Sequence, residues 1–106
     1  MTINEYQMEA LRTAGEADIV NGVLGLCGES GECADLIKKH MFQGHDLDPV
    51  HLAKELGDVA WYLAVSAHAL GYDLESIMQM NVDKLRKRYP DGFKPELSKN
   101  RKEGDV

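Results

Sequence analysis

The chain has 106 residues, of which 43% are hydrophobic and 28% are charged, and its formal net charge is −6. This length is typical of one globular domain, because two separate cores would each have too little apolar surface. The acidic balance speaks against binding of nucleic-acid polymers, which depends on a basic surface. The chain shows neither a membrane-spanning apolar run nor a signal-peptide pattern, so we expect a cytoplasmic protein without a membrane partner.

Helical signals begin at the first residues of the chain. Thr2 and Glu5 match a capping box, which predicts a first helix from about residue 3. Residues 13–17 then read as a turn. Apolar residues recur at helical intervals over 18–40, which predicts a second helix there.

The second half of the chain continues in the same way. A loop over 41–47 precedes Asp48 and Pro49, which suit the N-cap and first position of a third helix. Gly71 is the expected stop of that helix. A fourth helix is predicted to end near Pro90. No strand pattern is found, so the predicted class is all-α, with four to five helices in a bundle.

The organisation we expect is one domain over residues 1–97, followed by a disordered tail over 98–106. The tail sequence, SKNRKEGDV, contains a single apolar residue and cannot form a core. The apolar faces of the second and third helices are broad for a monomer. We therefore expect oligomerisation to complete the bundle, as a homodimer or as a homotetramer built from two dimers.

Four glycines recur at every third position of the second helix. They are Gly22, Gly25, Gly28 and Gly31. A glycine in a helix interior lowers helix stability by up to about 1 kcal/mol relative to alanine. A strip without side chains allows close packing of another helix, or it leaves room for a ligand. Both interpretations stay open from the sequence.

Two short acidic motifs carry the strongest chemical signal. Gly-Glu-Ser-Gly-Glu supplies Glu29 and Glu32, and Glu-Leu-Gly-Asp supplies Glu55 and Asp58. Each pair is spaced by three residues, which places both carboxylates on one helix face, where like charges cost roughly 0.2–0.5 kcal/mol. A cation would offset this repulsion. Hard oxygen ligands of this kind suit Mg²⁺, with Mn²⁺ as a substitute.

Candidate phosphate and base contacts lie on several of the predicted helices. An Asn, a Lys and an Arg share one face of the fourth helix and are able to bind phosphate oxygens. Two more lysines and a tryptophan are further candidates, although each residue alone is better explained as surface or core. The predicted substrate-binding residues are Asn81, Lys84, Arg88, Lys38, Lys54 and Trp61.

The histidines and cysteines give weaker signals. His51 lies one turn before Glu55 and is able to join the acidic site, but a surface role is the simpler interpretation. Cys27 and Cys33 are six residues apart on one helix, roughly 9 Å along its axis, which is beyond the usual reach of a disulfide. We read both as small buried hydrophobic residues.

Three motifs follow one another over about residues 20–93. In order, they are G-E-x-G-E, E-L-G-D-V-x-W-Y and N-x-x-K-L-x-x-R-Y-P-x-G-F. This order closely resembles the MazG-like nucleotide pyrophosphohydrolases of the all-α NTP pyrophosphatase superfamily. The resemblance implies Mg²⁺-dependent hydrolysis of a nucleoside triphosphate between its α and β phosphates. It also implies that the four motif carboxylates bind metal and that the block around Lys84 lies near substrate. One departure is Gly28, where many members carry a further glutamate.

The predicted function is therefore conversion of a (d)NTP and water to a (d)NMP and pyrophosphate. A metal-activated water would attack the α-phosphorus, with Glu29 or Glu32 as the catalytic proton acceptor. The alternative is a non-catalytic helical interaction module, or a metal-binding module, that retains the motif. A di-iron bundle is less well supported, because neither acidic motif has a histidine three residues on.

Overall fold

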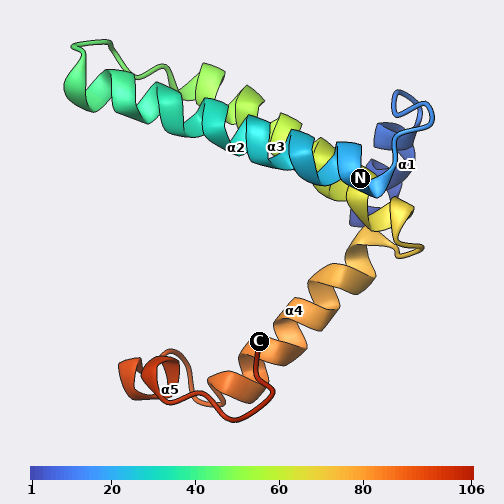
Figure 1. Cartoon of the computed structure of the whole chain (residues 1–106), viewed down its shortest axis with the longest axis vertical. Coiled ribbons are helices and arrows are strands. Elements are labelled where there is room, and N and C mark those ends of the chain that lie inside the picture. Colours follow the sequence, from blue (N-terminus) through green and yellow to red (C-terminus); the bar gives the residue numbers. More distant parts are fainter. The chain divides into compact units, whose positions relative to one another are not determined.

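The computed structural model describes all 106 residues and contains five α-helices and no strand (Figure 1). This confirms the predicted all-α class. The chain divides into two compact units, residues 1–74 and residues 75–106, which we describe one at a time. The single domain expected over 1–97 stays a prediction. None of the helices combines the length and apolar character needed to cross a membrane.

The first helix, α1 (Ile3–Leu11), begins with the predicted capping box. The Thr2 hydroxyl accepts a hydrogen bond from the Glu5 amide at 3.1 Å, and the Glu5 carboxylate accepts one from the Thr2 amide at 3.0 Å. Two of the backbone donors that a helix start leaves free are thereby paired. A turn over residues 12–16 follows, as expected.

The long helices α2 (Ile19–Phe42) and α3 (Pro49–Ala69) form the body of the first unit and lie side by side (Figure 1). Asp18 caps the start of α2, and Asp48 caps α3, with Pro49 at its first position as predicted. The second helix continues two residues beyond the predicted end. Its two cysteines were predicted to be buried, but Cys27 is exposed and Cys33 is half-buried. At 24 and 21 residues, the helices are about 36 Å and about 32 Å long.

The N-terminal half of α2 packs very closely on α3 because it presents glycines there. A side-chain carbon on Gly22 would clash with the Ser66 hydroxyl and would lie 3.3 Å from the Ser66 Cα. A side-chain carbon on Gly25 would overlap the ring of Tyr62. These two glycines are therefore required by close helix–helix packing.

The other two glycines of the strip have different surroundings. A side-chain carbon on Gly28 or Gly31 would meet nothing within 4 Å. The strip thus has a packed half and an open half. Close packing explains Gly22 and Gly25, whereas room for a ligand beside Gly28 and Gly31 stays a prediction.

The buried core of the chain is small and consists mainly of short side chains. The buried apolar residues are Ala10, Ala64, Val65, Ala67 and Leu74. Gln7 of α1 is buried among them and has its amide fully engaged: it donates to the Ala64 and Tyr72 carbonyls and accepts from the Leu74 amide at 3.0 Å. One polar side chain therefore ties α1 to the end of α3 and to the start of α4.

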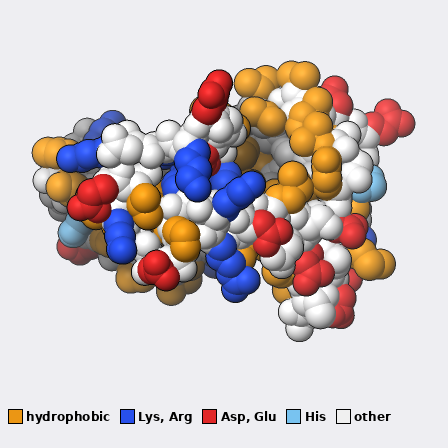
Figure 2. All heavy atoms as spheres, turned by 90° about the horizontal axis from the view of Figure 1, so that it is seen from below, with side chains coloured by type: hydrophobic (Ala, Val, Ile, Leu, Met, Phe, Trp, Pro, Cys, Tyr) orange, Lys and Arg blue, Asp and Glu red, His pale blue; other side chains and the backbone are white.

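Much larger apolar side chains of α2 and α3 are exposed to solvent, and apolar side chains are visible on the molecular surface (Figure 2). Leu24 is 68% exposed and Leu56 is 55% exposed. Others along the same two helices are Val20, Val23, Met41, Phe42, Val50 and Leu63. In an isolated chain these side chains contribute little to stability, since each Val or Leu gains roughly 1.5–3 kcal/mol only when it is buried.

The second unit contains nearly all of α4 (Leu74–Arg88) and the short α5 (Pro95–Lys99). Gly92, with a φ of 89°, lies in the turn that follows α4. The ring centroids of Tyr89 and Phe93 lie 5.3 Å apart, so Phe93 folds back onto the end of α4.

The segment after α5 also returns to α4 (Figure 1). The Arg88 guanidinium donates two hydrogen bonds to Asp105, from Nε at 2.8 Å and from Nη2 at 2.7 Å. Disorder of residues 98–106 stays a prediction, but this bidentate contact is a specific arrangement that their composition did not indicate.

Candidate metal centre

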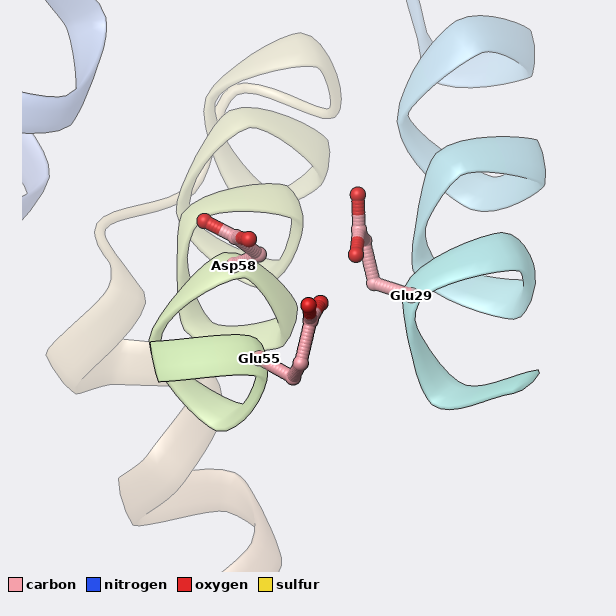
Figure 3. A group of neighbouring side chains, drawn as sticks. All are labelled: Glu29, Glu55 and Asp58. Carbon is pink, nitrogen blue, oxygen red and sulfur yellow. The ribbon is translucent and has the colours of Figure 1, made fainter. Parts of the chain in front are cut away.

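Three carboxylates from two helices meet in the first unit. Glu29 extends from α2, and Glu55 and Asp58 extend from α3 (Figure 3). One oxygen of each lies within 4.8 Å of the others. Glu29 and Glu55 are half-buried, whereas Asp58 is exposed. This group, called the acidic triad below, has the ligand type and the spacing for one hard divalent cation.

The packing of α2 on α3 explains why these side chains meet. Glu55 and Asp58 are one turn apart on α3 and share a face. Gly25 lies one turn before Glu29 and sets α2 against the Tyr62 ring, one turn beyond Asp58. The close contact at Gly25 therefore fixes how far the Glu29 carboxylate is from the two carboxylates of α3.

The electrostatics of the acidic triad favour a cation. The pKa of Glu29 is raised above its ordinary value, first by partial burial and then by a hydrogen bond shared with Glu55. The negative charges of Asp58, Glu55 and Glu32 raise it further. Such a shift means that the folded chain resists a further negative charge at this point. A bound divalent cation would remove that penalty, and oxygen ligands of this charge suit Mg²⁺ or Mn²⁺.

Glu32 is not part of the acidic triad. It is exposed and lies one turn beyond Glu29, although its charge contributes to the raised pKa of Glu29. The structure therefore brings together three of the four carboxylates that the motifs singled out. The role of Glu32 as a metal ligand stays a prediction.

Two further side chains border the acidic triad. The His51 ring lies 3.3 Å from the Glu55 carboxylate, through Nε2 and Oε1. Burial and the charge of Asp58 raise the pKa of Tyr6, which places this residue of α1 within the field of the site. No sequence pattern pointed to Tyr6, because no local spacing connects it to a residue about fifty positions later.

Trp61, a predicted base-stacking residue, has a structural contact. Its indole N–H donates to the Ala10 carbonyl at 3.1 Å and to the Thr13 hydroxyl at 3.0 Å. The ring also meets Tyr62 edge-on, with centroids 4.9 Å apart. Trp61 thus holds α1 against α3, and a role in substrate binding stays a prediction.

The predicted cationic residues are spread over both units. Lys38 lies 3.5 Å from Asp35, which also pairs with Lys39 at 2.8 Å, so both lysines share one carboxylate on α2. Lys54 is exposed on α3. The second unit contains the three candidates of α4, which are Asn81 and the cationic Lys84 and Arg88. Their approach to the acidic triad therefore stays a prediction.

Comparison with known proteins gives two findings. Residues 21–93 match the model of the MazG nucleotide pyrophosphohydrolase domain. The chain is also 36% identical over 104 residues to the gene 37 protein of Mycobacterium phage L5, an alignment that covers 83% of this chain and 89% of the phage protein. No solved structure matches the chain. The matched region contains all four motif carboxylates and the Asn81–Arg88 block.

Proposed function

The chain belongs to the MazG nucleotide pyrophosphohydrolase family, and from this premise we propose that it hydrolyses a (d)NTP to a (d)NMP and pyrophosphate at the acidic triad. The observation that carries the proposal is the meeting of Glu29, Glu55 and Asp58, whose oxygens lie within 4.8 Å of one another. Three carboxylates this close are suited to a metal-dependent reaction of a polyphosphate.

In this proposal the three carboxylates of the triad hold Mg²⁺, with Mn²⁺ as a substitute. When bound, the metal neutralises phosphate charge and lowers the pKa of water. The chain itself supplies the positions: α3 contributes two oxygens from successive turns, and α2 contributes the third. The close packing of the two helices keeps these oxygens in place without a flexible loop.

Glu29 and Glu32 are the proposed proton acceptors. Glu32 is exposed, one turn from the triad and not part of it, so its oxygens are free to accept a proton from water. Glu32→Gln separates two roles. If Glu32 accepts the proton, turnover falls and Mn²⁺ affinity is unchanged; if it is a fourth metal ligand, both fall together.

We also propose that Asn81, Lys84 and Arg88 bind the phosphates, with Lys38, Lys54 and Trp61 as further substrate contacts. Lys and Arg donate charge-assisted hydrogen bonds to phosphate oxygens. The match to the family domain over 21–93 supports their membership of one functional block.

The exposed apolar faces of α2 and α3 support a homo-oligomer, either a dimer or a dimer of dimers. A chain whose buried apolar side chains are three alanines, one valine and one leucine has a small core for 106 residues. Pairing of two copies through Leu24 and Leu56 would bury two of these exposed side chains. Light scattering of the purified protein measures the state directly.

The test of the function is incubation of the chain with a panel of NTPs and dNTPs, in Mg²⁺ and in excess EDTA. We expect at least one nucleotide to give equimolar monophosphate and pyrophosphate in Mg²⁺, and none in EDTA. Formation of a nucleoside diphosphate and inorganic phosphate would contradict cleavage between the α and β phosphates. No turnover of any nucleotide, modified ones included, would favour the non-catalytic module.

A further inference from the structure

A second charged site lies in the second unit, at the end of α4. The last turn of α4 and the segment after α5 enclose a pocket of about 410 Å³. Five cationic side chains and two carboxylates line it. The cations are Lys84, Lys87, Arg88, Arg101 and Lys102. Several Lys and Arg side chains lie near one another in the middle of the face drawn in Figure 2, and others lie apart from them.

The Arg88–Asp105 contact is the centre of this pocket. Two parallel hydrogen bonds of 2.8 Å and 2.7 Å join the guanidinium to the carboxylate. The Arg88 side chain is only 9% exposed and the Asp105 side chain 18%. This two-pronged geometry is the one in which arginine binds a carboxylate or a phosphate. The Arg88 guanidinium is therefore held in the geometry of an anion site, and a carboxylate of its own chain occupies that site.

Other cations also act on the Asp105 carboxylate. Its pKa lies below the ordinary value, first because of the Arg88 hydrogen bonds and then because of the charges of Arg88, Arg101 and Lys84. Lys84 and Arg88 are two of the three residues proposed to bind nucleotide phosphates. The segment thus places its carboxylate where a phosphate oxygen would have to bind.

We propose that residues 100–106 act as an intramolecular competitor, in which the Asp105 carboxylate covers a polyphosphate site formed by Lys84, Lys87 and Arg88 of α4. This inference rests on the proposed function in one respect, which is that the ligand is the triphosphate group of the nucleotide substrate. Binding of the ligand requires Asp105 to leave Arg88. A site that is open in one molecule out of ten binds its ligand about tenfold more weakly than a permanently open one.

The first test measures binding of inorganic triphosphate to the full chain by calorimetry, in EDTA so that no metal is held at the acidic triad. Asp105→Asn keeps the shape of the side chain but removes its charge, and we expect about tenfold tighter binding. Glu103→Gln is the matched control, since it removes the other carboxylate of the same pocket. Its effect should be about twofold at most. Equal affinities of the two variants, or weaker binding by Asp105→Asn, would overturn the proposal.

A second measurement uses the unaltered chain and does not depend on folding of a variant. The Asp105 amide donates to the Lys102 carbonyl at 3.1 Å, so amide exchange reports whether the segment is closed. Inorganic triphosphate should speed deuterium exchange over residues 100–106. Slower or unchanged exchange at a concentration that saturates binding would show that the ligand does not displace the segment.

Measurements of nucleotide turnover distinguish a failure of this proposal from a failure of the proposed function. If the chain hydrolyses a nucleotide, Asp105→Asn should lower its KM by the same factor as the binding constant, with kcat unchanged. Turnover with an identical KM would retain the function and reject the competitor. Tighter binding of triphosphate in EDTA without any turnover would retain the competitor and reject the function.

Discussion

The two halves of the α2–α3 pair differ in a way that a shared sequence pattern hides. Glycines at every third position run through both halves, yet only Gly22 and Gly25 contact α3. Beyond them the strip faces open space, and there Glu29 meets the two carboxylates of α3. One half therefore holds the helices together, and the other half presents charge.

The halves also have opposite effects on stability. Close packing at Gly25 and the bonds of Trp61 and Gln7 tie α1, α2 and α3 together. In the open half, like charges raise the pKa of Glu29, which is an unfavourable interaction in the metal-free chain. The packed half therefore supplies the rigidity with which the open half holds its carboxylates near one another.

The largest expected effect is on activity, from a change in the open half. Glu55→Gln removes the central charge of the acidic triad while keeping its size. Since loss of even an outer-shell partner of a metal costs 10–100-fold, we expect turnover to fall about 100-fold or more. The matched control is Asp35→Asn, an acidic residue of α2 that pairs with Lys39 outside the triad. Near-normal pyrophosphate release by Glu55→Gln would remove the triad from the mechanism.

The next effect is on stability, from a change in the packed half. Gly25→Ala places a methyl group in the Tyr62 ring and should destabilise the chain by about 1–3 kcal/mol, as overpacking does. Gly31→Ala, two turns further along the same helix, meets nothing and should stabilise it by up to about 1 kcal/mol. Urea unfolding measures both. Equal shifts of the two midpoints would mean that the strip is not divided.

A smaller effect is expected where α1 joins the packed half. Trp61→Phe removes the donor to the Ala10 carbonyl and the Thr13 hydroxyl, and should cost about 1 kcal/mol or more. Tyr62→Phe retains the ring that faces Gly25 and loses only a hydroxyl, so it serves as control. Thermal unfolding of the pair is the measurement. A midpoint unchanged by Trp61→Phe would show that the indole bonds do not stabilise the fold.

The smallest effect is a pH dependence in the open half. The pKa of Glu29 is raised in the folded state, so the folded chain binds this proton more tightly than the unfolded chain does. The resulting stabilisation is complete below the ordinary value of 4.5 and is lost as the pH rises through the raised pKa.

Comparison with Glu29→Gln isolates this contribution from the other carboxylates. In EDTA, the variant should gain stability over the unaltered chain as the pH rises, and added Mg²⁺ should cancel the difference. A constant difference in melting temperature across the acid range would contradict the clustered charge.

Features of the chain that depend on neighbouring residues were predictable from the sequence. Thr2, Asp18 and Asp48 cap their helices through residues two or three positions away, so their signals are local. The pairing of Glu55 with Asp58 on one face likewise follows from the helical repeat alone. The all-α class and the family resemblance rest on such local patterns.

Features set by long-range packing were not predictable. Glu29 and Glu32 have the same spacing and chemistry, and only the rotation of α2, fixed at Gly22 and Gly25, decides which of them faces α3. The indole bond of Trp61 joins residues about fifty positions apart. Asp105 lies in a segment whose composition indicated disorder, so its bond to Arg88 had no sequence signal.

The most direct test of the central claim is a titration of the chain with Mn²⁺, followed by the paramagnetic resonance of the free ion. Mn²⁺ is a substitute for Mg²⁺ at hard oxygen sites, and its free form is quantified without any substrate. We predict saturable binding by the unaltered chain and affinity at least tenfold lower for Glu55→Gln and Asp58→Asn, with Asp35→Asn unchanged. Equal binding by all four proteins would show that the acidic triad is not the metal site.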